Sequence, residues 1–132
     1  MKLEEVREAL EAQVVWGEDR LEVEIQVACA ADLMSDVLAF IKPHSLLLTG
    51  LTNVQSVRTA DVAEVKAVVY VRGKPPDREA VELAKEKGIA VLTTRLPMYE
   101  SCGRLYRRGL RGGSELKEEM SDARRASVHS AL

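Results

Sequence analysis

Residues 45–95 read SLLLTGLTNVQSVRTADVAEVKAVVYVRGKPPDREAVELAKEKGIAVLTTR, and this stretch decides the fold. Short apolar segments at 46–49, 67–71 and 89–92 alternate with segments whose apolar residues have helical spacing. Asn53 is suited to begin one of these helices and Gly88 to end another. Short, fully apolar strands separated by helices are typical of parallel strands that are covered on both faces. The stretch therefore predicts three consecutive βα units.

The segments on either side of these three βα units are expected to add further helices and a strand. Residues 2–13 have the apolar spacing of an amphipathic helix, and residues 21–27 alternate between apolar and polar side chains as a half-exposed strand does. Asp32 is expected to cap a helix that ends before Pro43, and a last helix is expected over 97–108. We predict an α/β fold: a mainly parallel sheet with helices on both faces, formed by three consecutive βα units after an N-terminal helix and strand.

Length and composition predict one domain with a tail. The chain has 132 residues, of which 46% are hydrophobic and 30% charged, which suits a single core. We assign residues 1–110 to an α/β domain. Residues 111–132 are rich in Gly, Ser, Ala and mixed charges, with a weak apolar stripe at Leu116, Met120 and Ala123, and are expected to form a flexible or weakly helical tail.

Charge and hydropathy exclude several partners. The formal net charge of -2 supplies no field that would attract nucleic acid or an anionic membrane. No apolar run approaches the roughly 20 residues that cross a bilayer, and the N-terminus lacks the apolar segment of a signal peptide. We therefore expect a cytoplasmic protein without nucleic-acid or membrane partners.

Searches for catalytic signatures find none. There is no glycine-rich phosphate loop followed by Lys-Ser/Thr, and the only histidines are His44 and His129. Cys29 and Cys102 are too few for a disulfide framework or a metal site, so they are interpreted as small apolar side chains. We expect no metal, no cofactor and no catalytic residue.

Polar residues follow each of the three predicted strands. Ligands of parallel sheets bind outside the carboxyl ends of the strands, where hydroxyls, cations and helix N-termini suit a phosphate. An equally weighted alternative is that these residues only cap helices and solubilise loops. The candidate ligand-binding residues are Thr49, Gly50, Thr52, Asn53, Arg72, Lys74, Thr94 and Arg95.

Four segments resemble the DRTGG-domain family, and the resemblance covers about residues 1–110. The most specific piece is the Asp-Leu-Met-Ser-Asp-Val of the first segment, whereas the naming signature of the family is represented only by Asp19-Arg20. The four segments are ACAADLMSDVLA at 28–39, LLTGLTN at 47–53, VYVRGK at 69–74 and CGRLY at 102–106.

The resemblance implies an α/β fold similar to the N-terminal domain of HPr kinase/phosphorylase. Related domains accompany CBS pairs in pyrophosphatases regulated by adenine nucleotides, and stand-alone members are encoded beside hydrogenase-type redox proteins. It thus implies a non-catalytic regulatory or assembly module that senses a nucleotide or another phosphorylated metabolite. A CBS-domain protein or a redox enzyme component would be its partner. The alternative is a small phosphoryl-transfer or hydrolytic enzyme that uses the strand-end residues.

Self-association is also expected. The segment 21–27 lies outside the βα repeat and is expected near a sheet edge, where unpaired backbone groups invite pairing. The helices at 2–13 and 97–108 have apolar stripes whose cover is not evident from the sequence. These features predict a symmetric homodimer.

Overall fold

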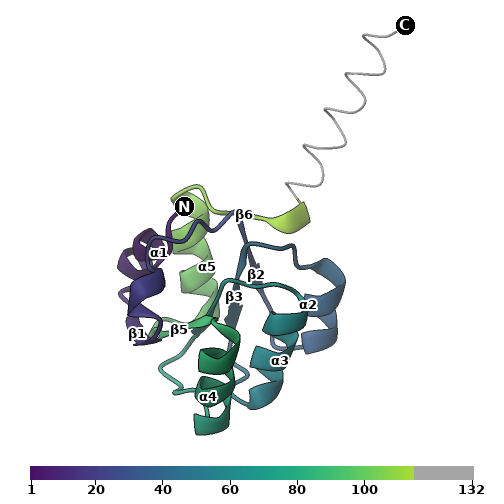
Figure 1. The fold of residues 1–132 in the computed structure, drawn as a ribbon. Coiled ribbons are helices and arrows are strands. Elements are labelled where there is room, and N and C mark those ends of the chain that lie inside the picture. Colours follow the sequence, from purple (N-terminus) through teal and green to yellow (C-terminus); the bar gives the residue numbers. More distant parts are fainter. Residues whose placement is uncertain (115–132) are drawn as a thin grey trace, which may run out of the picture.

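The computed structural model describes residues 1–114 and confirms the predicted fold class. A six-stranded sheet with the order β1-β5-β4-β3-β2-β6 has helices on both faces (Figure 1). Four neighbouring strands at its centre are parallel and in register. They are β2 (Val27–Ala30), β3 (Ser45–Thr49), β4 (Ala67–Tyr70) and β5 (Ala90–Thr93).

Two separate apolar cores lie against the two faces of the sheet. On one face, α1 (Leu3–Leu10) and α5 (Met98–Arg107) pack against Leu46, Val69 and Leu92. On the other face, three helices pack against Leu47, Val68 and Val91. These helices are α2 (Met34–Phe40), α3 (Val54–Val62) and α4 (Arg78–Lys87). Successive residues of one strand thus enter opposite cores, which is why the strands are apolar throughout.

The predicted capping residues fix the ends of two of these helices. The Asn53 side chain accepts a hydrogen bond from the backbone N–H of Gln55 at 3.0 Å and so begins α3. Gly88 ends α4 with a φ of 72°, in the left-handed region that favours glycine.

The strand predicted over 21–27 is wrong. The backbone carbonyls of Leu21 and Val23 accept hydrogen bonds from the N–H groups of Glu4 and Leu3 at the start of α1. The first N–H groups of a helix have no partner within the helix, and this segment satisfies two of them instead of joining the sheet. The strand begins only at Val27 and consists mostly of the small residues that the alternating pattern left out.

Two edge strands were not predicted. β1 (Gln13–Trp16) pairs antiparallel with β5, and β6 (Arg111–Gly112) pairs parallel with β2. Segments this short have no recognisable period. The sheet therefore includes two residues beyond the expected domain end at 110. The division of the chain there stays a prediction, because residues 115–132, with Leu116 and Met120, lie outside the described residues.

The Asp19-Arg20 pair lies in the short 3₁₀ helix Glu18–Arg20 and has a structural role. The Arg20 guanidinium lies 4.6 Å from the centre of the Trp16 ring, and its Nε donates to the carbonyl of Gly88 at 3.0 Å. Arg20 thus joins the turn after β1 to the end of α4.

Within residues 1–114, no helix has the length and apolar character that a membrane span requires.

Replacement of Val69 by alanine tests the double-sided core. Val69 has no exposed surface at the centre of β4. We expect Val69→Ala to lower the free energy of unfolding by about 1–3 kcal/mol, because buried methyl groups are lost and a cavity remains. Val62→Ala on the exposed side of α3 is the matched control and should change it by less than about 0.5 kcal/mol. Equal effects in urea denaturation would contradict this core.

Candidate functional site

The three loops that hold the candidate residues meet at one edge of the sheet. Thr49, Tyr70 and Thr93 are neighbours in the register at the carboxyl ends of β3, β4 and β5. The backbone N–H of Gly73 donates to the carbonyl of Thr94 at 2.8 Å, which joins the loops after β4 and β5. We call this edge the strand-end rim.

On the β3 side of the rim, the backbone N–H of Gly50 already donates a hydrogen bond to the carboxylate of Asp32. The Oδ1 of Asp32 accepts hydrogen bonds from the N–H of Gly50 at 2.7 Å and from the hydroxyl of Thr49 at 3.3 Å. The expectation that Asp32 caps a helix is therefore wrong, since the residue at that position of α2 is Leu33. Asp32 lies where an anion would otherwise meet the Gly50 N–H.

Other predicted residues at the rim hold the fold together. The buried hydroxyl of Thr94 donates to the carbonyl of Leu10 at 2.7 Å and accepts from the N–H of Leu96 at 3.2 Å. The carbonyl of Thr52 accepts from the N–H of Asp77 at 2.9 Å, and Asn53 is engaged as the cap of α3. These polar groups position the loops.

Three predicted cations remain open to a ligand. Arg72, Lys74 and Arg95 are exposed, and none of them makes a side-chain hydrogen bond or ion pair within residues 1–114. A Cβ placed on Gly73 would lie 4.0 Å from the Cα and Cγ of Arg95, so Arg95 lies beside the turn that holds the other two. We call these three residues the rim cations.

The backbone at this turn is held in an uncommon conformation. Arg72 has a φ of 63° in the left-handed region, where a non-glycine residue is disfavoured by about 1–2 kcal/mol. Hydrogen bonds from the N–H of Arg72 to Leu96 and from that of Gly73 to Thr94 hold it there. Residues held in such a conformation are concentrated at functional sites, although Glu11, His44 and Glu64 also have a positive φ in this chain.

Below the rim, Tyr70 is buried and bonded to Ser56. Their hydroxyl oxygens are 2.7 Å apart. Burial raises the pKa of the Tyr70 phenol, and the nearby charge of Asp77 raises it further. The phenol is therefore neutral at pH 7 and unsuited to act as a base. Asp32 and Asp77 add negative charge to this edge, which was not expected from the sequence, where Asp32 was predicted to begin a helix.

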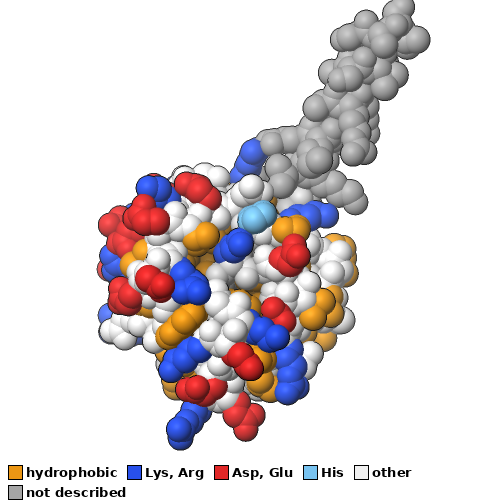
Figure 2. All heavy atoms as spheres, viewed as in Figure 1, with side chains coloured by type: hydrophobic (Ala, Val, Ile, Leu, Met, Phe, Trp, Pro, Cys, Tyr) orange, Lys and Arg blue, Asp and Glu red, His pale blue; other side chains and the backbone are white. Residues whose placement is uncertain are grey.

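His44 lies away from the rim, at the amino end of β3, where its backbone N–H donates to the carbonyl of Glu64. On the face of the molecule in view, acidic and basic side chains are interspersed (Figure 2), in keeping with the net charge of -2.

The two cysteines line a small cavity of about 200 Å³ between β2, β6 and α5. Burial raises the pKa of the Cys29 thiol, and the charge of Asp36 adds to the effect. Burial also raises the pKa of the Cys102 thiol. Both side chains are only half-buried, yet their thiols are protonated at neutral pH. They therefore lack the activation that a reactive cysteine requires.

Alkylation by iodoacetamide tests this environment. At pH 7.5 we expect both thiols of the folded protein to react more slowly than in the urea-unfolded chain, because the thiolate is the nucleophile and burial raises the pKa of both thiols. A raised pKa moves thiolate formation to higher pH, so the difference should shrink as the pH is raised through the folded-state pKa. Equal rates in the two states at pH 7.5, followed by mass spectrometry, would contradict it.

Comparisons with known proteins bear on the family and the fold. No curated protein matches the chain. The structure is similar to the CBS and DRTGG domains of the regulatory region of Clostridium perfringens pyrophosphatase, solved in complex with the activator diadenosine tetraphosphate. The TM-score is 0.66 at 20% identity, over 79% of this chain and 45% of that chain, so the likeness shows a shared fold. The DRTGG domain matches residues 5–107. This match spans well over half of the sequence, and the chain therefore belongs to the DRTGG-domain family.

Proposed function

We propose that this domain is a non-catalytic regulatory or assembly module that binds a nucleotide or another phosphorylated metabolite at its rim cations. The observation that carries the proposal is that Arg72, Lys74 and Arg95 lie on two joined loops without partners in residues 1–114. Like charges held on adjoining loops repel one another, and a phosphate group would relieve that repulsion through charge-assisted hydrogen bonds.

The hydrogen bonds at the rim indicate which groups a phosphate would contact. The Gly50 N–H and the Thr49 hydroxyl are bonded to Asp32, and Thr94 is bonded to Leu10. The ligand would therefore be held by side chains from the loops after β4 and β5. Thr49, Gly50, Thr52, Asn53 and Thr94 would shape the site but contribute no charge to it.

An adenine nucleotide is the first ligand to test. The similar pyrophosphatase region is complexed with diadenosine tetraphosphate as its activator, although the present chain spans only 45% of that chain. The rim cations suit the polyphosphate of such a molecule, since each arginine can form two hydrogen bonds to phosphate oxygens. The domain would respond to the nucleotide and pass the signal to a CBS-domain protein or a redox enzyme component.

Binding without turnover is favoured over a small phosphoryl-transfer or hydrolytic enzyme. Among residues 1–114, the rim offers no histidine, and Tyr70 is held neutral by burial. Asp32 is engaged with the N–H of Gly50. The described rim therefore supplies charge for binding, and of its two carboxylates one is bonded to Gly50 and the other, that of Asp77, lies at the start of α4.

Charge reversal at Arg72 tests the rim. ADP, ATP, diadenosine tetraphosphate, acetyl phosphate and inorganic phosphate, each at millimolar concentration, would be tested for a rise in melting temperature. We expect at least one nucleotide to stabilise the unmodified protein and Arg72→Glu to abolish the effect, because a cation beside a phosphate contributes about 1.5–3 kcal/mol. The rise should also diminish with added salt.

Arg58→Glu is the matched control for this experiment. Arg58 is an exposed arginine of α3, unpaired within residues 1–114, and its reversal should leave the response to nucleotide intact. Arg72→Glu itself should change stability by less than about 0.5 kcal/mol. Unfolding of Arg72→Glu, or no response of the unmodified protein to any of the compounds, would contradict the rim as a ligand site.

The assembly part of the proposal is a symmetric homodimer. We expect sedimentation velocity at tens of micromolar to give twice the protomer mass of 14.6 kDa. A homodimer would present two rims to one partner protein, which raises the effective concentration for binding. A monomer at every concentration up to 100 µM would contradict it.

A further inference from the structure

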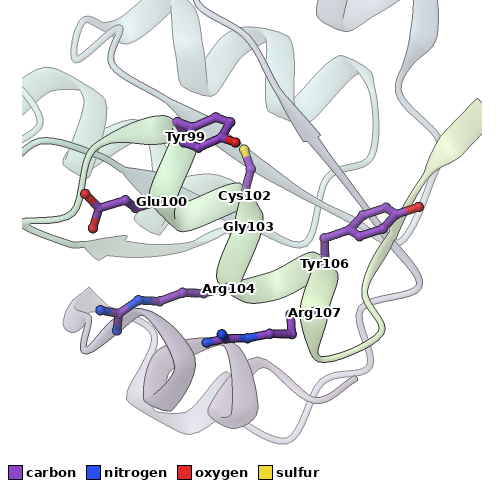
Figure 3. Close-up of a pocket in the computed structure, with 7 residues that line it drawn as sticks. All are labelled: Tyr99, Glu100, Cys102, Gly103, Arg104, Tyr106 and Arg107. Atoms are coloured by element: carbon purple, nitrogen blue, oxygen red, sulfur yellow. The ribbon is translucent and has the colours of Figure 1, made fainter.

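The helix α5 has one face in the core and another that the protomer leaves uncovered. Ser101 and Leu105 point into the core and are buried. Arg104 reaches α1, where it donates to the carbonyl of Ala9 at 3.3 Å and pairs with Glu11 at 3.6 Å. The remaining side chains surround a shallow hollow of about 580 Å³ over Gly103 (Figure 3). We call this the α5 face, formed by Tyr99, Glu100, Cys102, Gly103, Tyr106 and Arg107.

Large aromatic side chains are exposed on this face. Tyr99 is 90% exposed and Tyr106 is 58% exposed. In Figure 3 both lie on the same side of Gly103 as Cys102, whereas Arg104 and Arg107 extend on the side next to α1. Exposed tyrosines around a hollow are typical of the centre of a protein interface.

Gly103 has no evident role within its own protomer. It lies in the interior of α5, where glycine is about 0.5–1 kcal/mol less favourable than alanine. A Cβ at this position would have no atom of the chain within 4 Å, so no neighbour in the protomer requires its absence. A glycine at such a position lacks a Cβ and so leaves room for another backbone to approach closely.

The charges on the α5 face are complementary to those of a second copy in the reverse direction. Glu100 lies before Gly103 and Arg107 after it, and neither has an ion pair within residues 1–114. In an antiparallel pair centred on Gly103, each Glu100 comes opposite the Arg107 of the partner subunit. In a parallel pair, the Glu100 and Arg107 side chains of the two copies would lie on opposite sides of the crossing, so no such charge pair would form.

We propose that the α5 face is the homodimer interface, with two α5 helices crossing antiparallel at Gly103. Tyr99 then packs against Tyr106 of the partner subunit, on the side opposite the charge pairs. The same contacts occur twice about the two-fold axis, as an isologous interface requires. This inference rests on the homodimer of the proposed function, and it specifies where the two copies meet.

Cysteine crosslinking at Gly103 tests the position of the axis. In a Cys29→Ala, Cys102→Ala background, Gly103→Cys places one thiol beside its symmetry mate without a clash in the protomer. Mild oxidation with diamide should convert most of the protein to a covalent dimer on a non-reducing gel. Arg58→Cys in the same background, on exposed α3, is the control and should remain mostly monomeric.

Charge reversal provides a second measurement. Glu100→Arg and Arg107→Glu should each weaken the dimer about five- to tenfold in sedimentation equilibrium, and the double variant should restore it, since two symmetric pairs are affected at once. A dimer that neither crosslinks at position 103 nor responds to charge reversal would overturn the α5 interface and leave the proposed homodimer intact. A protein that stays monomeric would overturn both.

Discussion

Burial of the central strands on both faces is the constraint on which the rest of the structure depends. In β4, Val68 and Val69 enter opposite cores, so neither face of the sheet can be left to solvent. Helices must therefore lie on both sides, and each connection between parallel strands must cross from one end of the sheet to the other. The consequence for function is that the loops after β3, β4 and β5 all lie at one edge.

The polar groups at that edge fall into two sets: those that are hydrogen-bonded within the domain and those that are not. Buried or half-buried donors need acceptors, and at β3 the acceptor is the carboxylate of Asp32. At β5, Thr94 is bonded to the end of α1 through Leu10. The side chains left open to a ligand are the rim cations, whose loops are joined by backbone hydrogen bonds and carry no side-chain partner within residues 1–114. The proposed anion site consists of these side chains, which the fold leaves unpaired within residues 1–114.

Contacts on one side of α5 likewise leave its other side uncovered. Leu105 and Arg104 connect the helix to the sheet and to α1, which fixes its rotation about its own axis. That rotation directs Tyr99 and Gly103 outward. The proposed rim site and the proposed α5 interface are neighbours in the chain, because α5 begins directly after the loop of Arg95.

The sequence by itself determined the βα repeat, because apolar strands and caps such as Asn53 and Gly88 are local signals that each segment carries alone. It also placed Arg72 at the end of a strand. Only the tertiary structure decided that residues 21–26 serve the start of α1 instead of the sheet, and that Asp32 occupies the Gly50 N–H. Each of these outcomes depends on which donor lies opposite which acceptor across segments distant in the chain. A periodic pattern in the sequence shows which side chains of a segment share one face. It does not show which distant group will form hydrogen bonds with the backbone of that segment.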